Sequence, residues 1–355
     1  MAKKIVICFD GTWNTPDDNG DIDGDTSTNV FKLYDAVAAQ DAAGNPQAKW
    51  YDEGVGTRWY NRIAGGAFGV GLSRNIQQGY RRLVELYDDG DEIYIFGFSR
   101  GAYTARSLVG MIRNAGLLKP AHKAMVPVAY SLYRTRDAGA DSANALFFRQ
   151  SYAREIRIKC LGVWDTVGAL GIPLRSFQWF NQEYYEFHDT ELSGIVDNAF
   201  HALAIDEHRE NFRPTLWDPK HKPNQRMEQV WFPGAHADVG GGYPEFALAD
   251  IALRWMMERA ADCGLAFAPG SLPALDAANF AAPIHDSFGA FMKGMYQKVS
   301  TRVYRPIGAT VHGQERVHDA VLERCRQLAE YNPRNPMGTH LVGVASPVDR
   351  LRQLS

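Results

Sequence analysis

The chain has 355 residues, of which 45% are hydrophobic and 12% aromatic, enough for one large domain or a core with a small lobe. Its formal net charge is -3 and its Lys and Arg residues are scattered, which excludes the basic stripe of a nucleic-acid-binding protein. The 4 cysteines lie far apart without a C-x-x-C spacing, which excludes a zinc knuckle and a disulfide framework.

The N-terminal residues indicate where the protein works. The apolar run Ile5–Phe9 is too short for a signal peptide, and no apolar stretch is long enough for a transmembrane helix. We therefore expect a cytoplasmic protein, and export would need a route that is independent of a signal peptide.

The first predicted element is a buried strand from Lys4 to Phe9, followed by a loop that begins Asp10-Gly11-Thr12. Haloacid-dehalogenase-type phosphatases share the D-G-T, but Cys8 stands where they need their nucleophilic aspartate. A serine hydrolase instead places an oxyanion-binding N–H in a loop of this kind, which makes Gly11 and Thr12 candidate donors. A simple turn held by Asp10 is the alternative.

The next segments predict a loop, two helices and a strand. The acidic stretch Asp17–Asp25 resembles the opening of an EF-hand loop but lacks its closing glutamate, so we expect a solvated loop. Thr28 is the expected N-cap of a helix from Asn29 to Ala39. A strand is expected around Trp50-Tyr51, and a second helix from an N-cap at Ser73 to Tyr87.

The stretch from Asp91 to Gly116 carries the most specific motif. Ile93–Phe96 is a short β-favouring run that predicts a strand buried on both faces. Gly97-Phe98-Ser99-Arg100-Gly101, a G-x-S-x-G, follows it and precedes apolar residues at helical spacing. A nucleophile elbow needs this order, because its serine occupies a strained strand-to-helix turn. We predict that Ser99 is a nucleophile and that the Arg100 N–H faces the oxyanion; an ordinary glycine-rich turn is the alternative.

Two further strand ends carry candidate partners for Ser99. Residues 116–154 are expected to be mostly helical, and a strand from Ile156 to Val163 then leads to Asp165, a candidate triad acid. The aromatic-rich residues 170–190 are expected to form a small lid or cleft wall, or ordinary core.

The third candidate follows a predicted helix from Ile195 to Ala204 and a strand from Met227 to Phe232. His236 comes next, in a predicted glycine-rich loop that precedes a helix from Leu248 to Ala261. The resulting chain order, Ser then Asp then His, is that of α/β-hydrolases.

These elements predict a single α/β-hydrolase-like domain over residues 1–355, with a mostly parallel sheet and helices on both faces. Residues 266–355 are expected to wrap the surface. They include a final helix that begins near Arg316, and His318 within it is the alternative base.

Seven stretches together resemble a bacterial and fungal α/β-hydrolase family whose best-known members are Tle-type phospholipase effectors of type VI secretion systems. They are FDGTWN, YDEGVGTRW, IYIFGFSRGAYTAR, GVWDTVGALG, ALAIDEHRENF, FPGAHADVGGGY and ERVHDAV. The resemblance runs from Lys4 to about Asn335. The large effectors carry further membrane-binding or delivery segments, and we expect this chain to represent the catalytic core alone.

The resemblance implies a Ser–Asp–His esterase acting on phospholipids or other carboxylic esters, in transient contact with a membrane surface. The family's serine falls on Ser99, its aspartate on Asp165 and its histidine on His236 or His318. Such an enzyme needs no cofactor. The sequence predicts neither the oligomeric state nor the acyl chain and headgroup of the substrate.

Two other functions fit the same residues. One is a non-catalytic hydrolase-fold module that binds a partner in the cleft. The other is a metal-dependent phosphoesterase that uses Asp10, Asp238 and His236 as ligands, although no metal-ligand spacing supports it.

Overall fold

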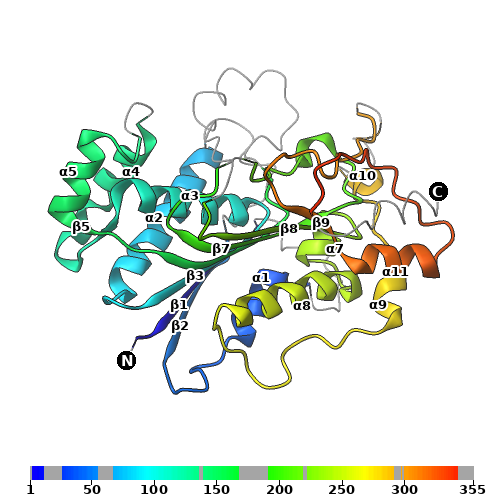
Figure 1. The fold of residues 1–355 in the computed structure, drawn as a ribbon, viewed down its shortest axis with the longest axis horizontal. Helices are drawn as coiled ribbons and strands as arrows, with labels where there is room; N and C mark the ends of the chain where they lie inside the picture. Colours follow the sequence, from blue (N-terminus) through cyan, green and yellow to red (C-terminus); the bar gives the residue numbers. More distant parts are fainter. Residues whose placement is uncertain are drawn as a thin grey trace.

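The computed structural model describes residues 2–11, 26–54, 67–135, 139–167, 191–218, 222–291, 297 and 300–342, with side chains from residue 71 onward in the third range. Within these residues seven strands form one parallel sheet: β1 (Lys4–Phe9), β2 (Gln47–Asp52), β3 (Glu92–Phe98), β6 (Ile158–Trp164), β7 (Val196–Ala204), β8 (Arg226–Phe232) and β9 (Glu315–Val317). Their order is β2-β1-β3-β6-β7-β8-β9 (Figure 1).

Helices cover both faces of this sheet (Figure 1). On one face lie α2 (Ala67–Leu86) and α3 (Arg100–Ala115), with α4 (Val126–Arg134) and α5 (Ala143–Tyr152) packed against α3. The other face carries α1 (Asn29–Ala36) and α8 (Ala247–Asp262). The remaining short elements are β4 (Leu117–Leu118), β5 (Ala153–Arg154), α7 (His236–Gly240), α9 (Ala277–Ala281), α10 (Ser287–Ala290), α11 (Asp319–Gln327) and 3-10 turns at Pro120–Met125 and Glu210–Phe212. The predicted α/β-hydrolase-like fold is confirmed.

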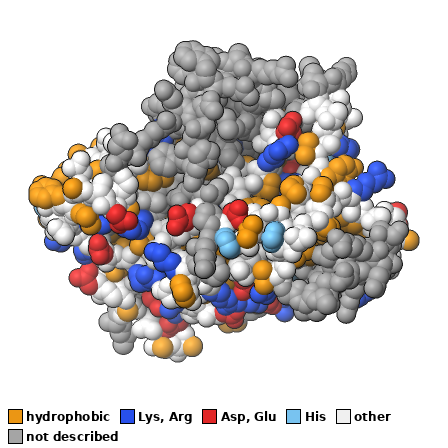
Figure 2. Space-filling view, turned by 45° about the horizontal axis from the view of Figure 1, so that its top comes forward, with side chains coloured by type: hydrophobic (Ala, Val, Ile, Leu, Met, Phe, Trp, Pro, Cys, Tyr) orange, Lys and Arg blue, Asp and Glu red, His pale blue; other side chains and the backbone are white. Residues whose placement is uncertain are grey.

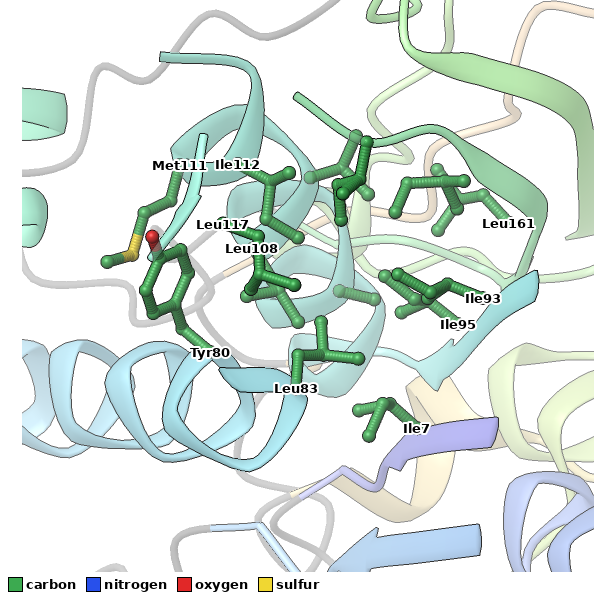
Figure 3. Packing of buried hydrophobic residues seen from close by; sticks show 14 of the residues in the cluster. Ile7, Tyr80, Leu83, Ile93, Ile95, Leu108, Met111, Ile112, Leu117 and Leu161 are labelled. Atoms are coloured by element: carbon green, nitrogen blue, oxygen red, sulfur yellow. The ribbon is translucent and has the colours of Figure 1, made fainter. Parts of the chain in front are cut away.

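The alternation of side chains along the strands divides the core into two layers. In β1, Ile7 packs toward α2 and α3, whereas Cys8 packs toward α1 and α8. Figure 3 shows the first layer, where Leu83 of α2 and Leu108 of α3 lie over Ile7 and its neighbours in β3. The central strands are therefore apolar on both faces, as parallel strands covered by helices must be.

The strand order produces a topological switch point at one place on the sheet edge. The chain moves from β1 to β2 on one side and from β3 onward on the other, so the connections at the carboxyl ends of β1 and β3 diverge. Ligands of open parallel sheets bind at such a switch point. Asp10-Gly11 follows β1 there and Ser99 follows β3.

Three sequence predictions about elements were wrong. Ile195–Ala204 was expected to be a helix, but β7 occupies Val196–Ala204. It is buried on both faces, so its apolar run has no period of two that would distinguish a strand from a helix. Ser73 lies inside α2 rather than at its start, and the short edge strand β9 precedes α11.

Some expectations fall on residues that the structure does not describe: the acidic loop Asp17–Asp25, the aromatic segment 170–190 and Thr12. No helix in the described part of the chain combines the length and the apolar character needed to cross a bilayer. On the face drawn in Figure 2, acidic and basic side chains are interspersed.

Candidate active site

Ser99 occupies a strained turn between β3 and α3. It is the N-cap of α3, with φ 56 and ψ -118, and only 6% of its surface is exposed. Glycine is required on both sides of it: a Cβ at Gly101 would lie 2.2 Å from the Phe9 carbonyl oxygen, and one at Gly97 would lie 2.5 Å from the carbonyl oxygen of Gly101. The G-x-S-x-G therefore forms the tight strand-to-helix turn that an elbow requires.

His236 and Asp165 lie in line with Ser99. The Ser99 hydroxyl donates to His236 Nε2 at 2.8 Å, and His236 Nδ1 lies 2.5 Å from Asp165 Oδ2. Asp165 follows β6 directly and is fully buried, with φ 38. His236 is the first residue of the short helix α7, and not part of an open glycine-rich loop as predicted. The helix fixes its position more firmly than a loop would.

The protonation states follow from the surroundings of the two groups. Burial disfavours the Asp165 carboxylate, but the Arg305 cation and the hydrogen bond from His236 outweigh burial and hold the pKa of Asp165 well below its ordinary value. An ionised carboxylate only accepts, so Nδ1 of His236 carries the proton and Nε2 is left as the acceptor. Burial lowers the pKa of His236 although Asp165 opposes that shift, so its imidazole is neutral at pH 7.

Two phenylalanine rings enclose the imidazole. The Phe98 ring lies 4.7 Å from the His236 ring, tilted, and the Phe212 ring lies 5.1 Å away, edge on. These contacts restrict rotation of His236 about its side-chain bonds. The Nε2–Oγ alignment therefore depends on packing as well as on hydrogen bonds.

Two buried ion pairs that were not predicted from the sequence surround this arrangement. Arg305 pairs with Asp165 at 2.7 Å, and Arg209 pairs with Glu207 at 2.7 Å. Glu207 also accepts from the His236 backbone N–H at 3.3 Å. Glu207 and Arg209 could have been found from the sequence, because charged residues that directly follow a strand are candidates for a site. The strand β7 before them was predicted to be a helix, so they were not considered. Arg305 lies in a segment without a clear pattern, so it had no signal.

The candidate oxyanion donors are placed differently from one another. Arg100 is the first residue of α3, where helix N–H groups have no intrahelical acceptor, and Ser99 makes no side-chain cap. Gly11 lies beside Ser99, since a Cβ on it would be 3.3 Å from the Ser99 Cβ. Its N–H donates to its neighbour Asp10 at 2.6 Å, and its role as an oxyanion donor stays a prediction. The buried carboxylate of Asp10 needs hydrogen-bond donors such as this N–H, because burying an unpaired charge is costly.

His318 has a local role away from Ser99. Its Nδ1 accepts from the Ala320 N–H at 3.1 Å as the N-cap of α11, and its ring stacks on Phe232 at 4.5 Å. Burial lowers its pKa to about 4. His318, the alternative base, is therefore not in the site. The strand β9, which was not predicted, ends directly before His318 and fixes its position.

The three suggested metal ligands have separate partners. Asp10 accepts from Thr28 and Tyr51, both at 2.5 Å, and Asp238 accepts from His285 at 2.6 Å. The nitrogens of His236 are taken by Ser99 and Asp165. Across the ranges that the structure describes, no three His, Cys, Asp or Glu side chains form a metal-ligand cluster. The phosphoesterase arrangement is thus not formed.

Relatives of the chain are found among sequences and solved structures. An uncharacterized protein of Saccharomyces cerevisiae, YEL023C, is 29% identical over 242 residues, which are 61% of this chain and 33% of that protein. An uncharacterized Pseudomonas aeruginosa protein of known structure is 18% identical, with a TM-score of 0.45 over 77% of this chain and 48% of that one. This chain thus spans a third of the yeast relative and about half of the Pseudomonas protein.

Two further structures are similar at a comparable level. The Tle1 effector bound to the VgrG spike of the Type 6 secretion system is 20% identical, with a TM-score of 0.43 over 68% of this chain and 51% of that one. A butyrate-bound thermophilic esterase, Est2 of Thermogutta terrifontis, is 13% identical, with a TM-score of 0.40 over 76% of this chain and 85% of that one.

A family model described as the catalytic domain of Tle1-like phospholipase effectors of the type VI secretion system matches residues 3–259. This range includes β1 to β8 and contains Ser99, Asp165 and His236. The chain belongs to the Tle1-like phospholipase effector family.

Proposed function

We propose that the protein is a serine hydrolase that cleaves carboxylic esters, with lipase or phospholipase activity. The observation that carries the proposal is the alignment of three buried groups: Ser99 Oγ lies 2.8 Å from His236 Nε2, and His236 Nδ1 lies 2.5 Å from Asp165. A nucleophile, a base and a group that orients the base, in this order and at these distances, are what acyl transfer requires.

The proposed reaction has two halves. Ser99 Oγ attacks the ester carbonyl while His236 Nε2 takes the hydroxyl proton, and Asp165 stabilises the imidazolium that forms. The Arg100 N–H, at the positive end of α3, stabilises the oxyanion. His236 then protonates the leaving alcohol, and a water molecule activated by the same imidazole releases the acyl group from Ser99.

The family suggests the class of ester. Its members are described as phospholipase effectors, so we propose a phospholipid or a related lipid ester as the substrate, reached by transient contact with a membrane surface. Cytoplasmic localisation stays a prediction.

Labelling with a fluorophosphonate, followed by mapping of the modified residue, tests the proposal. We expect the label on Ser99. Replacing Ser99 with alanine should remove the label and lower ester turnover by about 10⁴- to 10⁶-fold, because the attacking oxygen is lost. Ser271→Ala is the control, since this surface serine only contacts the Ala268 carbonyl.

The two results separate the proposed enzyme from the alternative. If the Ser99→Ala variant kept more than about a tenth of the unmutated turnover, the serine mechanism would be wrong. If the unmutated protein neither took the label nor cleaved any ester, a non-catalytic binding module would explain the fold better.

A further inference from the structure

The carboxylate of Asp165 is paired with a buried arginine from a distant part of the chain. Arg305 Nη1 donates to Asp165 Oδ1 at 2.7 Å and Nη2 donates to Oδ2 at 3.0 Å, a bidentate arrangement. The side chains of Arg305 and Asp165 are 3% and 0% exposed. Arg305 lies beyond residue 259, the last residue of the family match.

The same guanidinium also binds two backbone carbonyl groups. Nη1 donates to the Ala204 carbonyl at 2.7 Å, and Nη2 donates to the Phe212 carbonyl. The Phe212 ring packs edge on against His236. One side chain therefore fixes both the acid that orients the imidazole and an aromatic ring that confines it.

Arg305 is itself held in place by the C-terminal segment. The Asn335 side-chain amide donates to the Arg305 carbonyl at 3.0 Å and to the Ile205 carbonyl at 3.1 Å. This amide links the backbone of Arg305 to the end of β7. The guanidinium is thus presented to Asp165 by a fixed backbone.

These contacts saturate the carboxylate. Asp165 accepts from His236, twice from Arg305 and from the Ala204 N–H at 3.1 Å. A carboxylate with four donors has one orientation, because every rotation breaks a hydrogen bond in a dry environment. Arg305 also offsets part of the negative charge of the carboxylate, whereas an unpaired carboxylate would attract a proton to His236 more strongly.

We propose that Arg305 is a positioning residue of the hydrolytic site: it aligns Asp165 and Phe212 around His236 and extends the enzyme's activity to lower pH. This inference rests on the esterase function proposed above. Arg305 does not touch the reacting atoms and acts through Asp165.

Other charged groups also act on His236. Glu207 accepts from its backbone N–H, and Arg209 stacks on the Phe212 ring at 3.5 Å. Asp238, two residues along α7, is paired with His285. Glu207 and Arg209 form their own ion pair, so Arg305 is the cation whose removal leaves a carboxylate in contact with the imidazole unpaired.

The test compares Arg305→Met and Arg305→Lys with a matched control, Arg324→Met. Arg324 is also a buried arginine that holds two carbonyls, those of Phe280 at 2.7 Å and Ala282 at 2.6 Å, but it has no contact with Asp165. Each rate is divided by the concentration of sites titrated with fluorophosphonate, so a loss of folded protein does not count as a loss of rate.

We expect Arg305→Met to lower kcat per titrated site by about 10- to 100-fold with little change in KM, because small misalignments are costly. The acid limb of kcat/KM should move up by about one pH unit, since the cation that opposes protonation is gone. Arg305→Lys should restore the acid limb, because it keeps the charge, but not the full kcat, because it lacks the bidentate fork. Arg324→Met should change only the Tm.

A second readout does not depend on catalysis. The His236 Nδ1 proton in its 2.5 Å hydrogen bond to Asp165 should give a far-downfield proton NMR signal. This signal should shift or disappear in both Arg305 variants and stay unchanged in Arg324→Met. If the unmutated protein cleaves no ester, the proposed function fails, but this signal still tests the positioning role.

Clear results would overturn the inference. Arg305→Met with an unchanged kcat per site, an unchanged acid limb and an unchanged NMR signal would show that Arg305 only stabilises the fold. If Arg305→Met does not fold, Arg305→Lys decides: unchanged kcat and an unchanged NMR signal would contradict the proposal, whereas a lower kcat with an altered signal would support it.

Discussion

His236 is buried, with 6% of its surface exposed, and this burial has a kinetic consequence. The imidazole must be neutral to take the proton of Ser99, and burial lowers the pKa of His236 below its ordinary value of 6.5. We therefore expect kcat/KM to stay constant from neutral pH down through 6.5 and to fall only below it. A pH–rate profile with an acid limb above pH 7 would contradict the described environment of His236.

Exchange of each candidate histidine separates the base from the structural residue. His236→Ala should match Ser99→Ala in severity, because the members of a triad act as a unit. His318→Ala should keep the unmutated kcat per titrated site but lower the free energy of unfolding by about 1 kcal/mol, through loss of the N-cap of α11. His318→Asn, which can still cap, is the control. Inactive but stable His318→Ala would reverse the assignment.

Residues at the ends of strands could be located from the sequence, and residues that act through them could not. Ser99, Asp165 and His236 each follow an apolar run, so the position of the strand predicted where the side chain would lie. Gly11 was placed correctly, but its hydrogen bond to Asp10 depends on the conformation of one loop. Arg305 contacts Asp165 across 140 residues of sequence, and no local pattern reports such a contact.

At the scale of elements, the approach of α3 to β1 sets the geometry of the turn at Ser99. A Cβ at Gly101 would lie 2.2 Å from the Phe9 carbonyl oxygen and 2.7 Å from that of Asp10. These atoms belong to the backbone and cannot move aside as a flexible side chain can. The helix would have to shift away from the sheet, and the turn with it.

We expect Gly101→Val to give unstable or insoluble protein, because overpacking at this point costs a few kcal/mol, about 1–3 or more. Thermal unfolding and solubility measure the effect. Gly139→Ala is the control, since a Cβ there meets no atom within 4 Å. Soluble, fully active Gly101→Val protein would show that the turn tolerates bulk and is not the elbow described.

The sequence predicted elements well where a short β-favouring run ended at a turn, as in β1 and β3, or where a cap was present, as in α1 with its N-cap Thr28. It failed at β7 and β9 for different reasons. β7 contains three alanines, which have a high helix propensity, so its composition resembles that of a buried helix. β9 has only three residues, too few for any period to emerge, and the pairing with β8 that defines it is a tertiary contact.

At the scale of the whole molecule, two histidines with strongly lowered pKa values, His201 and His318, make stability depend on pH. His201 accepts from the Thr166 N–H at 3.1 Å through Nε2, and its Nδ1 faces the Gln229 carbonyl oxygen at 3.2 Å. A second proton on the ring would meet the Thr166 N–H. Burial accordingly lowers the pKa of His201 to about 3, and that of His318 to about 4.

We expect the free energy of unfolding to fall between pH 6.5 and 5. In this window the unfolded chain protonates both histidines and the folded chain does not, so each contributes up to about 1.4 kcal/mol per pH unit. His285, whose pKa is raised by Asp238, opposes this trend. Urea titrations at several pH values give the free energy of unfolding as a function of pH. In His201→Gln this free energy should fall less steeply between pH 6.5 and 5 than in the unmutated protein; an equally steep fall would contradict the prediction.

The contact between Arg305 and Asp165 also bears on how the protein is made. Ser99 leaves the ribosome roughly 200 residues before Arg305, an interval of about 10 to 40 s at ordinary rates of synthesis. During that time the nascent chain holds the nucleophile without the partner that orients its acid. If Arg305 acts as proposed, a nascent chain that lacks Arg305 is a poor hydrolase, and a cell that synthesises the protein is shielded from its activity until the segment around Arg305 has folded into place.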